Sequence, residues 1–255
     1  MSGGEIIFDI KTPLDDGTLA EHVRHALTLK LPELRDFEYP FEGDLTVIAN
    51  GPSGRKGPLD GKTLAINGAL KLFTDRGLAP TYWIACDPQE LVADFLDNAP
   101  DETTYLIASK CHPKVFEKLA GKNVILWHVH DTGTHELTAD LFPVSRAVSV
   151  TICAFEVMAR LGWRRFDTWG WDGCIMDGQE HAVAQKNMGN HIDIGVTNAE
   201  GVETHYTTIP AWGLEAQDAI SALRGFPFPI NIHGGGMIGD ILGIYLPVHI
   251  VTDPR

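Results

Sequence analysis

The chain has 255 residues, of which 44% are hydrophobic, and this is enough to build one large α/β domain with a substantial core. Its 34 acidic residues outnumber its 20 basic ones, which gives a formal net charge of −14 and disfavours general nucleic-acid binding, because that activity relies on basic patches. No apolar run reaches the roughly 18 residues of a membrane helix. The residues from Met1 to Glu5 lack the basic flank and apolar stretch of a signal peptide. We therefore expect a cytoplasmic protein without a membrane span or a nucleic-acid partner.

Residues 1–43 are predicted to form a lead-in segment with a helix over 21–31, and residues 44–255 a single nucleotide-binding domain. Short apolar, β-branched runs predict strands at 45–49, 62–66, 81–85, 104–108, 123–127, 165–169 and 229–232. Helical patterns between them cover 69–76, 88–96, 113–119, 150–161 and 214–223, and a short helix begins at Met237. This alternation predicts a Rossmann-like α/β fold, in which a mainly parallel sheet is flanked by helices. The polar stretch near 174–212 has weak periodicity and is predicted to be a lid-like insertion.

Polar residues and glycines follow directly on most of these strands. They are Asn50 to Gly54 after the first strand, Asn67 and Gly68 after the second, Asp87 after the third, Lys110 after the fourth, His128 to Asp131 after the fifth, Gly170 to Gly173 after the sixth and Gly234 to Gly236 after the last. In parallel sheets, ligands bind beyond the carboxyl ends of the strands. We therefore expect the ligand site at this edge of the sheet.

Two glycine loops have two interpretations each. The loop Asn50 to Gly54 is neither a Walker A motif nor a G-x-G-x-x-G fingerprint. It fits an ordinary tight turn as well as a site whose backbone N–H groups and Ser53 hydroxyl face a phosphate. The loop Gly234 to Gly236 fits either a turn or a close backbone approach before a helix N-terminus that faces an anion.

Cysteine and histidine spacings do not indicate a metal site. None of the four cysteines shares a C-x-x-C spacing with another, so buried reduced thiols are expected. His128 and His130 share one side of a strand end, and His191 and Asp193 form a second pair, but neither pair completes a set of three or four ligands. No G-x-S-x-G elbow is present to support a Ser–His–Asp triad. We predict no structural metal.

Several segments in register resemble a known group. The run Val47 to Ser53, V-I-A-N-G-P-S, is similar to the G-N-G-P-S opening of the MptE-like proteins (domain of unknown function 115) and of the related Campylobacter-type bacterial sialyltransferases. Further matches are Asn67 to an asparagine of the second strand, Asp87-Pro88 to an Asn-Pro or Asp-Pro, and Gly170-Trp171-Asp172 to a G-x-D. Ser149 to Thr151 resembles a T-S-G segment whose serine and glycine are not kept in place, and the helix after it ends in Leu161-Gly162-Trp163, like the family's L-G-[YF]. The register extends from about residue 45 to 173.

The resemblance implies a Rossmann-like domain that binds a nucleotide donor, which in the sialyltransferases is a cytidine nucleotide sugar. Carried over, the nucleotide-binding residues are Asn50, Gly51, Pro52, Ser53, Asn67, Asp87, Thr151, Gly170 and Asp172. The sialyltransferases use a lid histidine as general base, a role that suits histidine near neutral pH. Here His205 lies nearest the family position, while His181 and His191 remain alternatives that cannot be aligned securely.

The leading functional hypothesis is a nucleotide-dependent transferase, with sialyltransferase-like glycosyl transfer from a small-molecule nucleotide sugar to an acceptor hydroxyl. One alternative is an MptE-like pyrophosphokinase that uses ATP and Mg²⁺ held by Asp87 and Asp172. Another is a non-catalytic nucleotide-binding protein of the same fold. An NAD-dependent oxidoreductase is disfavoured because the G-x-G-x-x-G fingerprint is missing. The sequence leaves the donor, the acceptor, catalytic competence and the oligomeric state open, with a homo-oligomer among the options.

Overall fold

The computed structural model describes residues 14–37, 43–131, 133–145, 147–184, 189–198 and 201–251. Eight strands form one sheet in the order β10-β9-β6-β1-β2-β3-β4-β5, and every neighbouring pair is parallel. The strands are β1 (Asp44–Ile48), β2 (Thr63–Ile66), β3 (Tyr82–Ala85), β4 (Thr104–Ala108), β5 (Asn123–Trp127), β6 (Arg165–Trp169), β9 (Ile230–His233) and β10 (His249–Val251). Two further strands, β7 (Ile192–Thr197) and β8 (Glu203–Thr208), pair antiparallel as a separate hairpin.

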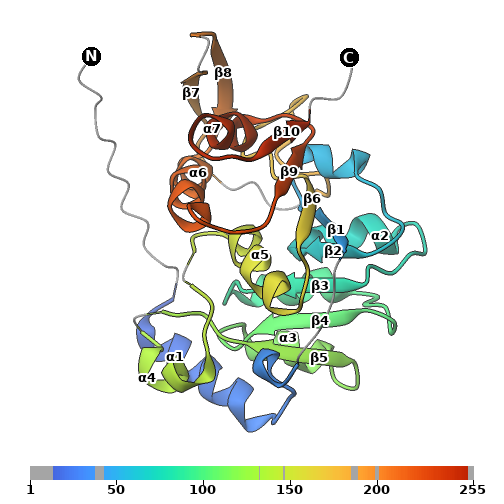
Figure 1. Ribbon diagram of the computed structural model, residues 1–255. Coiled ribbons are helices and arrows are strands. Elements are labelled where there is room, and N and C mark those ends of the chain that lie inside the picture. Colours follow the sequence, from blue (N-terminus) through green and yellow to red (C-terminus); the bar gives the residue numbers. More distant parts are fainter. Residues whose placement is uncertain are drawn as a thin grey trace.

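Helices cover both faces of the sheet (Figure 1). They are α1 (Asp16–Thr28), α2 (Leu70–Thr74), α3 (Pro113–Lys118), α4 (His135–Thr138), α5 (Val150–Arg160), α6 (Pro210–Leu223) and α7 (Met237–Tyr245), with short 3₁₀ helices at Leu34–Asp36, Pro52–Lys56, Asn67–Ala69, Glu90–Leu96 and Ala139–Leu141. Parallel crossovers are right-handed. The connections between β1 and β5 therefore lie on one face of the sheet. The other face carries α5, α6 and α7, which precede β6, β9 and β10 in the chain. The contacts agree, because α6 touches both α5 and α7, while α3 touches the 3₁₀ helix 90–96.

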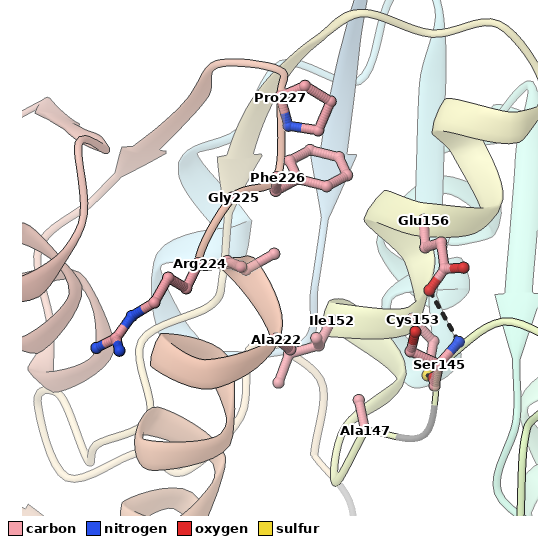
Figure 2. A pocket seen from close by; sticks show the side chains of 11 residues that line it. Ser145, Ala147, Ile152, Cys153, Glu156, Ala222, Arg224, Gly225, Phe226 and Pro227 are labelled. Atoms are coloured by element: carbon pink, nitrogen blue, oxygen red, sulfur yellow. Dashed lines mark hydrogen bonds between the residues drawn. The ribbon is translucent and has the colours of Figure 1, made fainter.

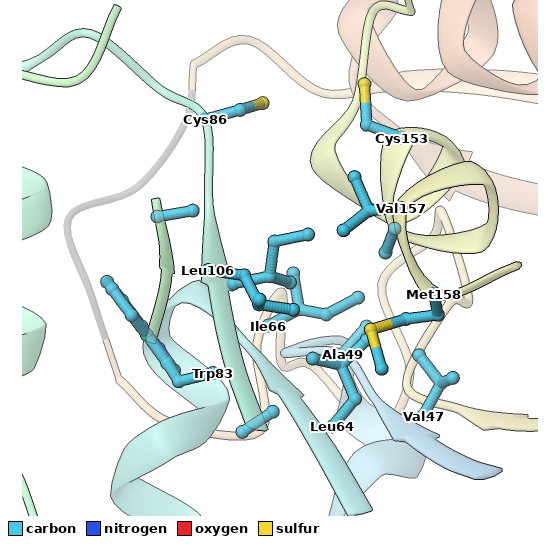
Figure 3. Close-up of a cluster of buried hydrophobic side chains, with 14 of the residues drawn as sticks. Val47, Ala49, Leu64, Ile66, Trp83, Cys86, Leu106, Cys153, Val157 and Met158 are labelled. Carbon is cyan, nitrogen blue, oxygen red and sulfur yellow. The ribbon is translucent and has the colours of Figure 1, made fainter. Parts of the chain in front are cut away.

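The central strands are apolar because both of their faces are covered. Every residue of β2 is buried. Figure 3 shows Val157 and Met158 of α5 next to Val47 and Leu64 of the two central strands, all of them members of one continuous core. The four cysteines are buried free thiols, which confirms the prediction made from their spacing.

The N-terminal helix α1 packs on the β5 end of the sheet. It contacts α3 and α4, and the ring of its His22 hydrogen-bonds the Lys110 carbonyl at 3.1 Å. Just after α1, the Pro32 carbonyl accepts a hydrogen bond from the Leu126 N–H of β5 at 2.8 Å. The described part of residues 1–43 thus covers an edge strand that would otherwise expose unpaired backbone groups.

The α/β class, the parallel sheet and the seven predicted strands are confirmed, with boundaries that shift by one residue at most. The differences lie mainly at helix starts, where side chains and prolines decide the boundary. Helix α1 begins earlier than expected because Asp15 caps it, accepting a hydrogen bond from Thr18 N at 3.0 Å. Helix α6 begins at Pro210, since proline suits the first turn. Strands β7, β8 and β10 were not predicted. Across the described ranges, no helix is both long enough and apolar enough to cross a membrane.

Candidate functional site

The sheet reverses its strand order between β1 and β6. From β1 the chain moves outward to β5, and after returning to β6 it moves the opposite way to β10. Connections that leave neighbouring strands in opposite directions open a crevice at their carboxyl ends, where open α/β sheets bind ligands. A cleft of about 1550 Å³ lies there.

Most of the predicted nucleotide-binding residues line this cleft. Those at its surface are Asn50, Gly51, Asn67, Asp87, Thr151, Gly170 and Asp172. They come from the ends of β1, β2, β3 and β6 and from the first turn of α5. Pro52 and Ser53 are not among the lining residues and lie behind the cleft wall.

Ser53 and Asp172 tie the loop after β1 to the loop after β6. The Ser53 N–H donates to Asp172 Oδ2 at 2.8 Å, and the Ser53 hydroxyl donates to Oδ1 at 2.6 Å. The Ser53 oxygen in turn accepts from Gly170 N at 2.8 Å, and Gly51 N donates to the Gly170 carbonyl at 2.8 Å. The two loops at the reversal point therefore form one hydrogen-bonded unit.

These hydrogen bonds occupy the N–H groups and the Ser53 hydroxyl that the sequence suggested as donors to a phosphate. Gly51 and Ser53 donate to the loop after β6, Gly54 N donates to the Gly51 carbonyl at 2.9 Å, and Pro52 has no N–H. In this conformation, Asn50 and Gly51 line the cleft, while the N–H groups of Gly51, Ser53 and Gly54 are used by hydrogen bonds within the protein.

The glycine loop before α7 closes the same unit from a third side. Gly236 has a φ of +111°, and a Cβ there would lie 2.8 Å from the Asp172 carbonyl oxygen. The Ile238 N–H in the first turn of α7 donates to that carbonyl at 3.1 Å. The glycines thus allow close packing on Asp172. The Asp172 carbonyl bonds one N–H group in the first turn of α7, where the sequence suggested an anion site.

Asp172 is 1% exposed, and its burial raises the pKa of the carboxyl to about 6, although the Ser53 hydrogen bonds and the nearby Lys56 act to lower it. Burial also raises the pKa of Glu215 on α6, whose carboxylate accepts from Trp171 Nε1 at 2.6 Å. Both carboxyls thus lie in the cleft wall with partners that fix their orientation.

Asn67 has an unusual backbone conformation for a residue that follows a strand. Its φ is +47°, in the left-handed region that asparagine tolerates better than most residues. Its carbonyl accepts from Trp83 Nε1 at 2.8 Å, while its side-chain oxygen has no hydrogen-bond partner in the described part of the chain. Such strain is frequent at functional sites. The buried, unpaired amide oxygen at a residue that lines the cleft makes Asn67 a candidate for contact with a ligand.

The three candidate histidines occupy different environments. His181 lines the cleft, its ring packs edge-on against Trp212 with centroids 5.7 Å apart, and burial lowers its pKa. His205 lies on β8 with a side chain that is 70% exposed, 3.8 Å from Glu203, and is not among the lining residues. His191 is also outside the lining, 2.6 Å from Glu180. The sequence names all three and favours His205, whereas the structure brings only His181 of the three to the surface of the cleft.

Asp87 and Asp172, the two carboxylates that the sequence suggests as Mg²⁺ ligands, both line the cleft and both accept hydrogen bonds from the protein. Both oxygens of Asp172 accept hydrogen bonds from Ser53, and Asp87 Oδ1 accepts from Gln89 N at 2.9 Å. Within the ranges that the structure describes, no three His, Cys, Asp or Glu side chains are grouped closely enough to hold a metal ion.

A second cavity, of about 240 Å³, lies between α5 and the connection from α6 to β9 (Figure 2). Cys153 and Phe226 line it, and Glu156 at its rim accepts from Ser145 N at 2.9 Å. None of the predicted nucleotide-binding residues lines this cavity. The larger cleft is therefore the candidate functional site.

Comparison with known proteins gives a relationship of fold only. No family model matches the chain, and no curated protein matches it in sequence. Among solved structures it is similar to the MAf glycosyltransferase from Magnetospirillum magneticum AMB-1, with a TM-score of 0.62 and 12% identity. The match covers 95% of this chain but 39% of the other, so the chain spans well under half of that protein's length. The fold of this chain is therefore similar to part of a glycosyltransferase, while membership of the MptE-like family stays a prediction.

Proposed function

We propose that this protein is a glycosyltransferase-like transferase that binds a nucleotide-type donor in the cleft between the loops after β1 and β6. The observation that carries the proposal is the convergence of Asn50, Asn67, Asp87, Thr151 and Asp172, from five separate segments, on one cleft at the reversal point of the sheet. The fold similarity to a glycosyltransferase supports the same reaction class.

The cleft offers distinct groups to the parts of such a donor. Asn67 lines the cleft, and its amide oxygen, buried and unpaired in this conformation, can accept from a base or ribose when the side chain turns toward the ligand, while Asp87 lies at the end of the neighbouring strand. Thr151 lies in the first turn of α5, where N–H groups and the helix dipole favour a phosphate. Asp172 keeps lone pairs beyond those that Ser53 uses, and it can accept from a ribose hydroxyl.

His181 is the general base that the geometry favours over His205. Burial lowers its pKa, so the imidazole is neutral near pH 7 and can accept a proton. The acceptor oxygen forms its bond to the anomeric carbon of the sugar, the bond to the nucleotide phosphate breaks, and the proton of the acceptor hydroxyl passes to His181. The exposed ring of His205 lies outside the cleft surface.

A nucleotide-binding screen tests this proposal. We expect at least one of CMP, CDP, UDP, GDP and ATP to raise the melting temperature of the wild-type protein. Asn67→Ala should weaken that binding about tenfold, since a lost hydrogen bond in a buried site costs on the order of 1–2 kcal/mol. Asn123→Ala is the matched control, because Asn123 lies at the opposite, amino-terminal edge of the sheet. Binding of no nucleotide, or equal effects of the two variants, would refute the proposal.

The same screen separates the alternatives. Turnover of a nucleotide sugar with release of the nucleotide supports the glycosyl-transfer reaction. Binding of ATP alone, strictly dependent on Mg²⁺, would replace it with diphosphate transfer. Tight binding without turnover of any donor, unchanged by His181→Ala, would identify a non-catalytic nucleotide-binding protein.

A further inference from the structure

Four hydrogen bonds fasten the loop after β1 to residues 182–183, more than 120 positions later in the chain. Ala182 N donates to the Asn50 carbonyl at 2.7 Å, and Val183 N donates to Asn50 Oδ1 at 3.0 Å. Asn50 Nδ2 donates back to the Val183 carbonyl at 3.5 Å, and Arg55 Nε donates to the Ala182 carbonyl at 2.6 Å. The backbone directly after His181 is therefore held from the β1 side of the cleft.

The Asn50 side chain imitates a neighbouring β-strand. Its amide offers one acceptor and one donor, and these match the N–H and the carbonyl of the single residue Val183. Alanine would remove both groups, whereas aspartate would keep the acceptor, which makes the shorter of the two bonds. Arg55 adds a charge-assisted bond on the preceding peptide.

The held segment carries cleft-lining residues. His181 and Val183 both line the cleft, and Ala182 between them is 3% exposed. The segment lies within the stretch that the sequence indicates as a lid-like insertion. The segment belongs to neither a helix nor a strand, so these hydrogen bonds, together with the packing of Ala182 and Val183 against the core, hold it beside the end of β1.

We propose that Asn50 and Arg55 are positioning residues, a clamp that holds residues 181–183 against the cleft so that His181 faces it. The importance of His181 for turnover rests on the proposed function, whereas the clamp itself does not. Asn50 then acts mainly through the segment that it holds, because its amide is occupied by Val183.

Amide hydrogen exchange in the ligand-free, full-length protein tests the clamp directly. In Asn50→Ala, the Val183 amide loses its acceptor and should exchange about tenfold faster than in the wild type. In Asn50→Asp, the retained carboxylate oxygen should keep the Val183 rate within about threefold of the wild type. In Arg55→Ala, both the Ala182 and Val183 amides should exchange faster, and Arg55→Lys should not restore them, because its ammonium does not reproduce the Nε geometry.

A titration of His181 by NMR adds a second measurement, its pKa, which would not change if Asn50 and Arg55 stabilised only their own loop. Burial lowers the pKa of His181, so release of its segment should raise that pKa towards the ordinary value in Asn50→Ala and Arg55→Ala. Two weaker influences raise this pKa, the charge of Glu180 and a hydrogen bond to the Asn50 backbone, and loss of the second on release would offset only part of the rise because burial is the largest cause.

The clamp is overturned if the Val183 rate in Asn50→Ala stays within twofold of the wild type, or if Asn50→Asp exchanges as fast as Asn50→Ala. An unchanged His181 pKa in both alanine variants would also overturn it. These measurements need no nucleotide. Failure of the nucleotide screen would therefore remove the proposed function and leave the clamp to be judged by exchange alone.

Discussion

The side chain of Asp172 has both a structural role and a place in the candidate site. It bridges the loops at the reversal point through Ser53, and it lies in the wall of the candidate site. A carboxylate that accepts two hydrogen bonds usually ionises easily, but burial outweighs those bonds here and raises its pKa from 3.8 to about 6. The group therefore changes its charge in a range that solution measurements can reach.

The raised pKa of Asp172 predicts how stability depends on pH. Between about pH 4 and pH 6, the folded state holds the Asp172 proton and the unfolded state has lost it. The free energy of unfolding should therefore fall as the pH rises through this window, by roughly 2–3 kcal/mol from this group. Urea unfolding of the wild type and of Asp172→Asn, measured from pH 4 to pH 7, should give a difference in stability that declines by this amount. Parallel curves for the two proteins would contradict the expectation.

The two histidines from the insertion give opposite expectations for turnover. His181→Ala should lower the rate of sugar transfer by about 10²–10⁴-fold, as is typical for loss of a general base, and should leave nucleotide affinity nearly intact. His205→Ala should leave the rate within twofold of the wild type, because that ring is exposed outside the cleft surface. Steady-state kinetics with the donor found by the binding screen measures both. A large loss in His205→Ala with full activity in His181→Ala would restore the assignment expected from the sequence.

At the scale of elements, glycine decides how closely the loops after β1 and β6 approach. Gly170 has a φ of +75°, and a Cβ there would collide with the Ala49 carbonyl. Gly178 has nearly the same φ, +73°, with nothing within 4 Å of its Cβ position. Gly178→Ala should therefore cost about 1 kcal/mol of backbone strain, and Gly170→Ala should cost at least 2 kcal/mol more. Equal losses in urea unfolding would show that the close approach at Gly170 is unimportant.

Helix α6 provides a second expectation at this scale. Glu215 joins it to the loop after β6 through Trp171 Nε1, and burial disfavours its charge. Glu215→Gln keeps the acceptor and removes the charge, so it should leave stability at pH 7 unchanged or slightly higher. Glu215→Ala should cost about 1–3 kcal/mol because the Trp171 N–H loses its partner. Thermal or urea unfolding of the two variants measures these changes. A loss of stability in Glu215→Gln as large as that in Glu215→Ala would contradict the expectation.

The strands that the sequence predicts well are those in which buried residues recur at successive or alternate positions. The runs at 104–108 and 123–127 became β4 and β5 without any shift because they are almost continuously apolar and buried, and 165–169 became β6, in which burial alternates along the strand. The hairpin β7–β8 escaped prediction because most of its residues are exposed and polar. It is held beside α7 by a small separate cluster that includes Val196 and Met237. Figure 1 shows the hairpin at the end of the molecule away from β5.

The whole molecule explains what local patterns could not reveal about the site. Strand ends in a parallel sheet meet at one edge, so the positions of Asn50, Asn67 and Asp87 follow from the pattern alone. The pairing of Ser53 with Asp172 depends on β1 and β6 being neighbours, although they are 119 positions apart at that contact. Nothing local in the loop 50–54 distinguishes a donor that faces a ligand from one that faces another loop. For the same reason, the sequence could name His181 but could not place it in the cleft.

The described part of the N-terminal segment packs at the sheet edge formed by β5, so we predict that it belongs to the same folding unit, whereas the sequence suggests a separate lead-in. Helix α1 buries Leu19, Val23 and Ala26, and the chain after it pairs with Leu126 of β5. Deletion of residues 1–43 should therefore expose apolar surface on α3 and an unpaired strand edge, and should lower the melting temperature by 10 °C or more or cause aggregation. Arg24→Ala, at an exposed position of α1, is the control and should melt within about 2 °C of the wild type. If residues 44–255 alone melted at the wild-type temperature, the N-terminal segment would be an independent appendage. A single unfolding transition in the full chain that shifts to lower temperature on deletion would show one cooperative unit. Helix α1 would then stabilise β4 and β5, and through the hydrogen bond of His22 to the Lys110 carbonyl it would also stabilise the part of the cleft that Lys110 lines.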